Sequence, residues 1–203
     1  MELTKHAHAC VALTKAGRTL VIDPGVFTPG AREAVAGADA VLVTHEHFDH
    51  LDEELLRSAA VPVVGPPGVR EKVGERVTAA APGDRLEIAG FDVRVVGGEH
   101  AEIHAGIPRI ENLGYVIDGA VYHPGDAYFV PGVPIGTLLL PSSGPWTRFG
   151  EAADFVRAVG PERVVQIHEL MLSELGQKSF ATLVEGLAGV PVEVLPPGSS
   201  VTL

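Results

Sequence analysis

The sequence predicts an α/β fold in which two β-sheets pack against each other and helices cover them. Short β-rich segments separated by Gly and Pro occur in both halves of the chain, and stretches with helical spacing of apolar residues lie between them. The chain has 203 residues, of which 46% are hydrophobic, enough for a substantial core. No linker, charge run or short repeat divides it, so we expect a single domain over residues 1–203.

The first elements are strands. Residues 8–13 and 19–22 are rich in β-formers, and the second strand ends at the turn Asp23-Pro24-Gly25. Residues 40–43 are fully apolar, as expected of a strand buried on both faces. Apolar residues then recur at helical spacing over 51–59, with carboxylates in the first turn, where the helix dipole favours them.

The remaining elements follow the same reasoning. Further strands are predicted at residues 61–64, 85–88, 92–96, 113–117, 120–122 and 137–140. A helix over 152–159 is stopped by Gly160-Pro161, and an apolar strand over 164–167 ends at His168. A last helix over 180–187 and a last strand over 192–195 complete the prediction.

The segment THEHFDHLD, residues 44–52, follows the strand over 40–43. Burying its histidines and aspartates is costly unless a cation such as a metal ion holds them together. His45 and His47 leave an extended chain on the same side, so both can bind one ion, and Asp49 and His50 follow after a turn. The pattern H-x-H-x-D-H arises by chance only about 0.0007 times in a chain of this composition.

Three further candidate ligands each follow a predicted strand. His100 comes after Gly97-Gly98-Glu99, Asp126 after Pro124-Gly125, and His168 directly after residues 164–167. With the first cluster they supply five histidines and two aspartates, which suits two divalent ions. Zinc is the first expectation, and manganese or iron also fit, because imidazole and carboxylate discriminate weakly among these metals.

These motifs together resemble the metallo-β-lactamase superfamily, and the similarity spans nearly the whole chain. The resemblance implies an αββα sandwich. It also implies a dinuclear site with His45, His47 and His100 on one metal, Asp49, His50 and His168 on the other, and Asp126 bridging both. The short chain and His8-Ala9-Cys10 are similar to the small L-ascorbate-6-phosphate lactonase-like branch. The lack of a cysteine ligand in the second site counts against antibiotic hydrolysis.

The predicted activity is metal-dependent hydrolysis of a small molecule. A hydroxide held by two metal ions attacks an ester, lactone, amide or phosphodiester bond, since the ions lower the pKa of bound water to about 7. Asp49 can orient that hydroxide. His104 is a candidate proton donor, although a solvated loop position fits it equally well. A nucleic-acid phosphodiesterase and a metal-binding protein without turnover are the alternatives.

Other residues are predicted beside the metals. His8, Asp23 and His123 are expected to support the ligands, because metal-bound imidazoles need partners that fix their tautomers. Ser143, Trp146 and Arg148 follow an apolar strand and are expected to line the substrate site; a turn into the next helix, with Trp146 packed on the core, is the alternative.

Composition excludes some functions. The formal charge is −11 and the 15 Lys and Arg are spread along the chain, which argues against binding nucleic acid. No apolar run approaches the ~18 residues of a membrane span, and the first residues lack the apolar core of a signal peptide. The single Cys10 cannot form an internal disulfide. We therefore expect a cytoplasmic protein with a small-molecule substrate and no membrane contact; a homo-oligomer is not excluded.

Overall fold

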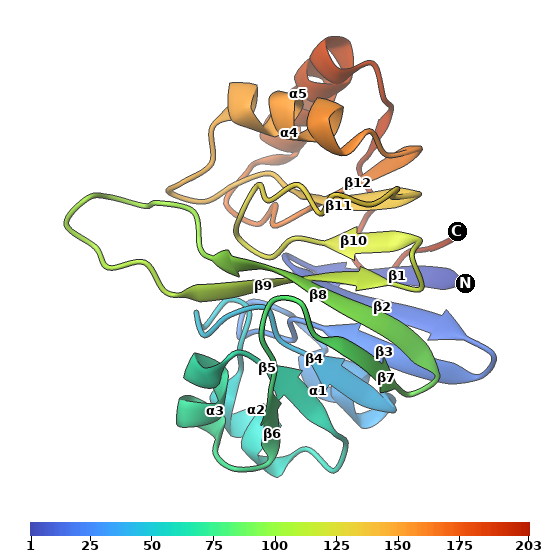
Figure 1. Ribbon diagram of the computed structural model, residues 1–203. Helices are drawn as coiled ribbons and strands as arrows, with labels where there is room; N and C mark the ends of the chain where they lie inside the picture. The colour runs from blue at the N-terminus through green and yellow to red at the C-terminus, as the bar shows by residue number, and fades with distance from the viewer.

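The structure is a computed structural model that describes all 203 residues, and it consists of two seven-stranded sheets packed face to face (Figure 1). The first sheet has the order β14-β1-β2-β3-β4-β5-β6. Its strands are β1 (Glu2–Ala7), β2 (Cys10–Lys15), β3 (Arg18–Ile22), β4 (Ala40–Leu42), β5 (Val63–Gly65), β6 (Val77–Ala79) and β14 (Ser200–Thr202).

The second sheet has the order β13-β12-β11-β10-β9-β8-β7. Its strands are β7 (Arg85–Ile88), β8 (Phe91–Glu99), β9 (Glu111–Ile117), β10 (Val121–His123), β11 (Thr137–Pro141), β12 (Arg163–Ile167) and β13 (Val192–Glu193).

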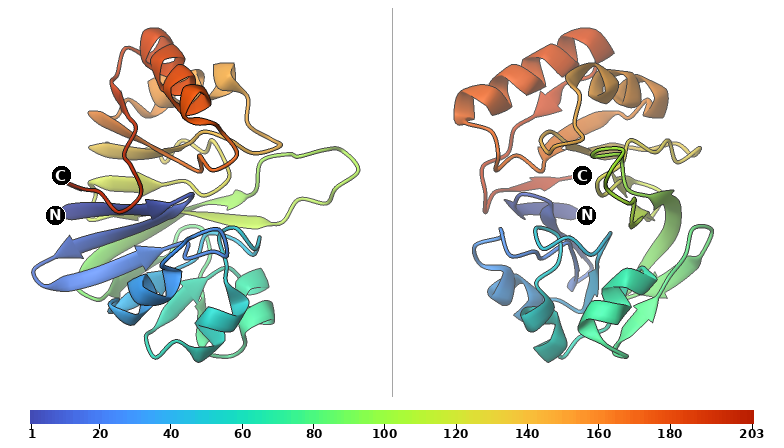
Figure 2. Two further views of the ribbon diagram at one scale, coloured as in Figure 1. Left: turned by 180° about the vertical axis from the view of Figure 1, so that it is seen from behind. Right: turned by 90° about the vertical axis from the view of Figure 1, so that its left-hand side faces the viewer.

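Helices cover the outer face of each sheet, as both views in Figure 2 show. The helices α1 (Ala31–Ala36), α2 (Glu53–Ser58) and α3 (Pro67–Val73) lie on the first sheet, and α4 (Phe149–Val159) and α5 (Glu174–Ala188) on the second. This arrangement confirms the predicted αββα sandwich. None of the five helices has the length and apolar character that a membrane crossing requires.

Three apolar clusters hold these layers together. The central cluster has 19 buried residues and lies between the two sheets. Each of the other two clusters lies between one sheet and the helices that cover it. Tyr115 of β9 is buried in the central cluster, and its hydroxyl donates to the Val43 carbonyl, 2.8 Å away on the other sheet. This bond satisfies a buried polar group. It also fixes the second sheet against the end of β4, which leads into the histidine-rich segment 44–52.

The topology brings strand ends to one edge. Strands β3, β4, β5 and β6 run parallel in the first sheet, and β10, β11, β12 and β13 run parallel in the second. The carboxyl ends of parallel strands meet at the same edge of a sheet, which is where α/β folds place their ligands. The loops after β4, β10 and β12 therefore lie together.

The sequence missed several short elements and misplaced some boundaries. The strands β1, β6 and β14 and the helices α1 and α3 were not predicted. The strand expected over 8–13 begins only at Cys10, because His8 has φ 54° and turns the chain between β1 and β2. The strand β1 was missed because Lys5 occupies an inward-facing position between buried Leu3 and Ala7, which breaks the apolar alternation.

Two later boundaries also differ. The helix expected over 180–187 is longer, since Ser173 caps α5 by accepting a hydrogen bond from the Gly176 amide at 3.1 Å. The last strand over 192–195 is shorter, because only Val192 and Glu193 pair with β12.

Candidate metal centre

All seven predicted ligands lie in one cluster at the shared edge of the two sheets. They come from the loop after β4 and from the ends of β8, β10 and β12. They form overlapping groups whose donor atoms lie within 4.8 Å of one another. The first group is His45, His47 and His100, and the second is Asp49, His50 and His168, joined by His8; a further set of His45, His50 and Asp126 links the two.

In the first group, three imidazoles face one another. His45 Nε2 lies 3.1 Å from His47 Nδ1, and the His100 ring centroid lies 5.0 Å from that of His45. His45 and His100 are buried, whereas His47 is half-buried at the surface of the cluster. The group is therefore open to solvent on the side of His47.

The second group has the spacing of ligands around one ion. His168 Nε2 lies 3.4 Å from Asp49 Oδ2 and 3.1 Å from His50 Nε2. Asp126 Oδ1 lies 3.2 Å from His50 Nε2 and 3.3 Å from His168 Nε2. Donor atoms placed ~2.0–2.1 Å from a tetrahedral ion are separated by about 3.3 Å, so these four atoms fit one zinc-sized ion.

Asp126 faces both groups with different oxygens. Its Oδ1 belongs to the second group, while its Oδ2 lies 3.5 Å from His100 Nε2 of the first. Asp126 Oδ1 and His100 Nε2 are buried and have no hydrogen-bond partner in the protein. Buried polar atoms without partners are costly, and a divalent cation would satisfy both. The residues present therefore fit a metal centre.

The ligand histidines are held by their outer nitrogens. His45 Nδ1 lies 3.0 Å from the Thr44 hydroxyl, His50 Nδ1 donates to Asp23 Oδ2 at 2.7 Å, and His100 Nδ1 donates to the Ala101 carbonyl at 2.6 Å. With the proton on Nδ1, each imidazole turns the lone pair of Nε2 toward the centre. This is the tautomer in which Nε2 can bind a metal.

The electrostatics of the cluster also suit a cation. Burial lowers the pKa of His45 well below its usual value, so that imidazole is neutral. Although burial opposes it, the carboxylates of Asp126 and Asp23 raise the pKa of His50 well above normal. In the same way Asp126 and Asp49 overcome burial and raise the pKa of His168 to about 9. Without metal, protons on His50 and His168 therefore balance the carboxylates in the way that bound metal ions would.

Asp23 lies directly behind the ligands. Besides binding His50, it accepts hydrogen bonds from the Thr44 amide and hydroxyl, both at 2.7 Å. Two residues later, a Cβ atom on Gly25 would lie 2.1 Å from the Asp49 carbonyl oxygen. The Asp-Pro-Gly turn thus packs against the backbone of the metal motif, and only glycine fits at its third position.

The other two supporting residues differ in what they touch. His8 Nε2 lies 3.0 Å from Asp49 Oδ2, in direct contact with a candidate ligand. His123 instead donates from Nε2 to the Ala9 carbonyl at 2.9 Å and accepts the Gly125 amide at 3.1 Å. His123 therefore holds the turn that carries Asp126.

The structure does not bring His104 to the cluster. It is exposed in the long loop between β8 and β9, which projects from the body of the molecule (Figure 1), and its Nδ1 accepts the Gly106 amide at 3.0 Å. Arg148 is also exposed and pairs with Glu151 at 3.1 Å. Neither residue contacts a candidate ligand.

Trp146 and Ser143 are buried and bind the ligands. The Trp146 indole donates to Asp126 Oδ2 at 2.9 Å, and the Ser143 hydroxyl donates to the His168 carbonyl. The segment after β11, which was expected to line the substrate site, therefore also holds two of the ligands.

Sequence reasoning missed Asn112 and Thr44. The Asn112 side chain accepts the Asp126 amide and donates to the Pro124 carbonyl, both at 2.9 Å, and so shapes the turn that carries Asp126. Nothing near Asn112 in the sequence signals this role. For Thr44, the position directly before His45 was a sequence feature that could have indicated its contact with that ligand.

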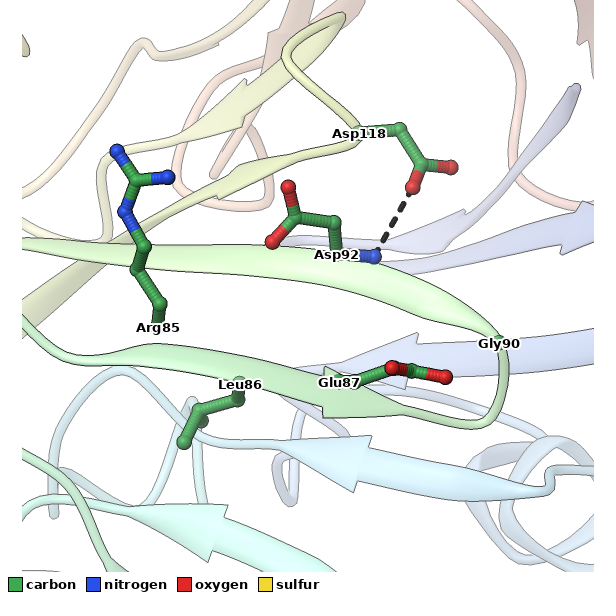
Figure 3. A pocket seen from close by; sticks show the side chains of 6 residues that line it. All are labelled: Arg85, Leu86, Glu87, Gly90, Asp92 and Asp118. Atoms are coloured by element: carbon green, nitrogen blue, oxygen red, sulfur yellow. Dashed lines mark hydrogen bonds between the residues drawn. The ribbon is translucent and has the colours of Figure 1, made fainter.

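One small hollow reaches the cluster, where His47 and His100 line it together with Ile103 and Ile107. A pocket of about 400 Å³ lies at the β7–β8 hairpin, where Arg85, Glu87, Asp92 and Asp118 line it (Figure 3). Asp118 accepts a hydrogen bond from the Asp92 amide at 3.0 Å there. No residue of the metal cluster contributes to this pocket.

This combination of sandwich fold and edge cluster is that of the metallo-β-lactamase superfamily. The family model described as "Beta-lactamase superfamily domain" matches residues 2–168, so the chain belongs to that superfamily. The resemblance seen in the motifs is thereby confirmed at the level of the superfamily.

The similarity to known relatives covers the whole chain. It is 37% identical to Protein Rv0786c of Mycobacterium tuberculosis over 100% of both chains. It is 29% identical, again over 100% of both, to a UPF0173 metal-dependent hydrolase of Pyrobaculum arsenaticum. Among solved structures it is similar in fold to Igni18, a metallo hydrolase of Ignicoccus hospitalis, with a TM-score of 0.78, 22% identity, and coverage of 98% of this chain and 97% of Igni18.

Proposed function

We propose that this protein is a dinuclear hydrolase that cleaves an ester, lactone, amide or phosphodiester bond of a small molecule. The observation that carries the proposal is Asp126, whose two oxygens each face a separate group of histidines. Two bound divalent ions, zinc in the first instance, would supply a Lewis acid and lower the pKa of water to about 7.

The remaining roles, holding the ions and orienting water, fall to residues of the chain. His45, His47 and His100 would hold one ion and Asp49, His50 and His168 the other. Asp49 retains some exposure and is the ligand carboxylate placed to orient a water molecule, while His8 restrains it from behind. Trp146 and Asn112 fix Asp126 from two sides.

The test is metal content by elemental mass spectrometry on protein without a histidine tag, combined with turnover of a generic phosphodiester and a generic lactone. We expect about two ions per chain and hydrolysis of at least one substrate. His45→Ala and Asp126→Ala should lose metal and activity together, whereas His104→Ala, outside the cluster, should keep its metal. Full metal occupancy in both ligand variants, or a metal-loaded protein that turns over neither substrate, contradicts the proposal.

A further inference from the structure

An open apolar groove lies beside the metal centre, between the segment after β11 and the start of α5. Its volume is about 600 Å³, within the ~300–1,000 Å³ typical of small-molecule sites. The groove is lined by Ser142, Ser143, Gly144, Pro145, Thr147, Phe149, Met171, Leu172 and Phe180.

The walls offer apolar side chains and few free polar groups. Phe149, Met171, Leu172 and Phe180 are the hydrophobic residues of the lining. The serine hydroxyls are turned to the main chain, since Ser142 donates to the Ile167 carbonyl at 2.9 Å and Ser143 to the carbonyl of His168. Met171 is 58% exposed, so a bound apolar group would remove it from water.

The groove and the candidate metal centre share one bordering segment, residues 142–147. Ser143 lines the groove and binds the backbone of His168, while Pro145 and Thr147 flank Trp146, which donates to Asp126. The Trp146 ring lies 6.2 Å from the ring of His100. A single short segment therefore borders the metal ligands on one side and the groove on the other.

Gly144 packs closely against Trp146. It has φ 131°, and a Cβ atom there would lie 3.0 Å from the Trp146 indole nitrogen. The lack of a side chain at Gly144 therefore lets the segment that lines the groove lie close to the indole that binds Asp126.

We propose that the substrate carries an unbranched apolar chain of about four to eight carbons, which lies in this groove while the scissile bond lies at the metals. This inference rests on the proposed hydrolase function and names its substrate class: esters or lactones with an aliphatic tail. A second copy of the protein covering the groove is the competing occupant, because Leu175, Leu183 and Leu187 of α5 are also exposed.

Binding is measured first, on zinc-loaded protein, with butanol, hexanol and octanol as probes. Trp146 is the only tryptophan, and its neighbours Pro145 and Thr147 line the groove, so its fluorescence should change when the groove is occupied. A fully buried methylene contributes about a fourfold gain in affinity. Because the groove is open on one side, we expect about two- to fourfold tighter binding per added methylene.

A matched pair of variants locates the binding. Met171→Gln should weaken octanol binding at least threefold, whereas Leu183→Gln, at a similarly exposed position that does not line the groove, should leave it unchanged. Affinity that is independent of chain length, equal effects of the two variants, or a stable dimer that excludes octanol would each overturn the proposal.

Turnover then separates this inference from the proposed function. The measurement compares kcat/KM for p-nitrophenyl acetate and octanoate, which share a leaving group; we expect at least a tenfold preference for octanoate, reduced by Met171→Gln. Equal rates for the two esters contradict the groove and leave the hydrolase standing. Chain-dependent alcohol binding with no turnover of any ester, lactone, amide or phosphodiester contradicts the hydrolase and leaves the groove standing.

Discussion

His8 shows how a single residue outside the predicted ligands can act on the metal centre. It is fully buried, and its Nε2 lies 3.0 Å from Asp49 Oδ2. Asp49, His50, His168 and Asp126 already offer four closely spaced donor atoms to one ion, so we expect His8 to act as a donor to Asp49 rather than as a further ligand.

We predict that His8→Leu weakens binding of one of the two ions about 10- to 100-fold, because partners of metal ligands typically contribute that much. His8→Gln keeps an N–H group that can reach Asp49 and should restore part of the affinity. Competition with a chelator measures both, and His6→Gln, outside the cluster, is the control. Unchanged affinity in His8→Leu would contradict this role.

Gly25 is a second residue whose identity is fixed by a close contact, here with the backbone of Asp49. We predict that Gly25→Ala displaces the Asp49 backbone, costs about 1–3 kcal/mol of stability and lowers metal content, because its Cβ would lie 2.1 Å from the Asp49 oxygen. Gly186→Ala is the control: nothing lies within 4 Å of its Cβ in α5, so it should stabilise by about 0.5–1 kcal/mol. Urea unfolding distinguishes them, and equal stability of the two variants would rule out the close contact.

At the scale of elements, β1 and the end of β12 are joined by a buried ion pair. Lys5 Nζ lies 2.5 Å from Glu169 Oε1, both side chains are buried, and the same oxygen accepts the His8 amide at 3.3 Å. The His168 amide donates to the His8 carbonyl at 2.9 Å, and both histidines have positive φ. The pair thus ties two strands together beside the metal ligands.

We predict that Lys5→Met destabilises the protein by about 3–5 kcal/mol, because it leaves the Glu169 carboxylate buried without a counter-charge. The double variant Lys5→Met/Glu169→Leu should recover most of that loss, since no charge remains buried. Urea denaturation of the single and double variants tests this, and an additive loss in the double variant would show that the pair is not the cause.

At the scale of the whole molecule, the metal centre couples folding to pH. In the metal-free protein the pKa of His168 is raised from 6.5 to about 9 by nearby carboxylates. A raised pKa contributes stability that is present below pH 6.5 and is lost as pH rises through about 9.

Metal-free protein should therefore lose up to about 3 kcal/mol of stability between pH 6.5 and 9, at 1.36 kcal/mol per pKa unit. Metal-loaded protein should not show this loss, because ions replace the protons. Urea unfolding of chelator-treated and zinc-loaded samples at the two pH values measures the difference; the same pH dependence in both samples would contradict the coupling.

The sequence by itself determined the class of fold, the strands that end in the ligands and the seven candidate ligands. These signals are local: strands show as apolar runs, and H-x-H-x-D-H lies within six residues of one loop. The isolated ligands were found because each follows a strand, where the fold class requires chemistry. The sequence missed β1, since a buried lysine has no local signature.

Only the tertiary structure decided what the ligands touch. Asn112 and Trp146 fix Asp126 from 14 and 20 residues away, and His8 reaches Asp49 across 41 residues. It also placed His104 and Arg148 away from the cluster and opened a groove between α4, α5 and the segment after β11. Such contacts arise from the pairing of distant strands and the packing of their loops, which leave no periodicity in the chain.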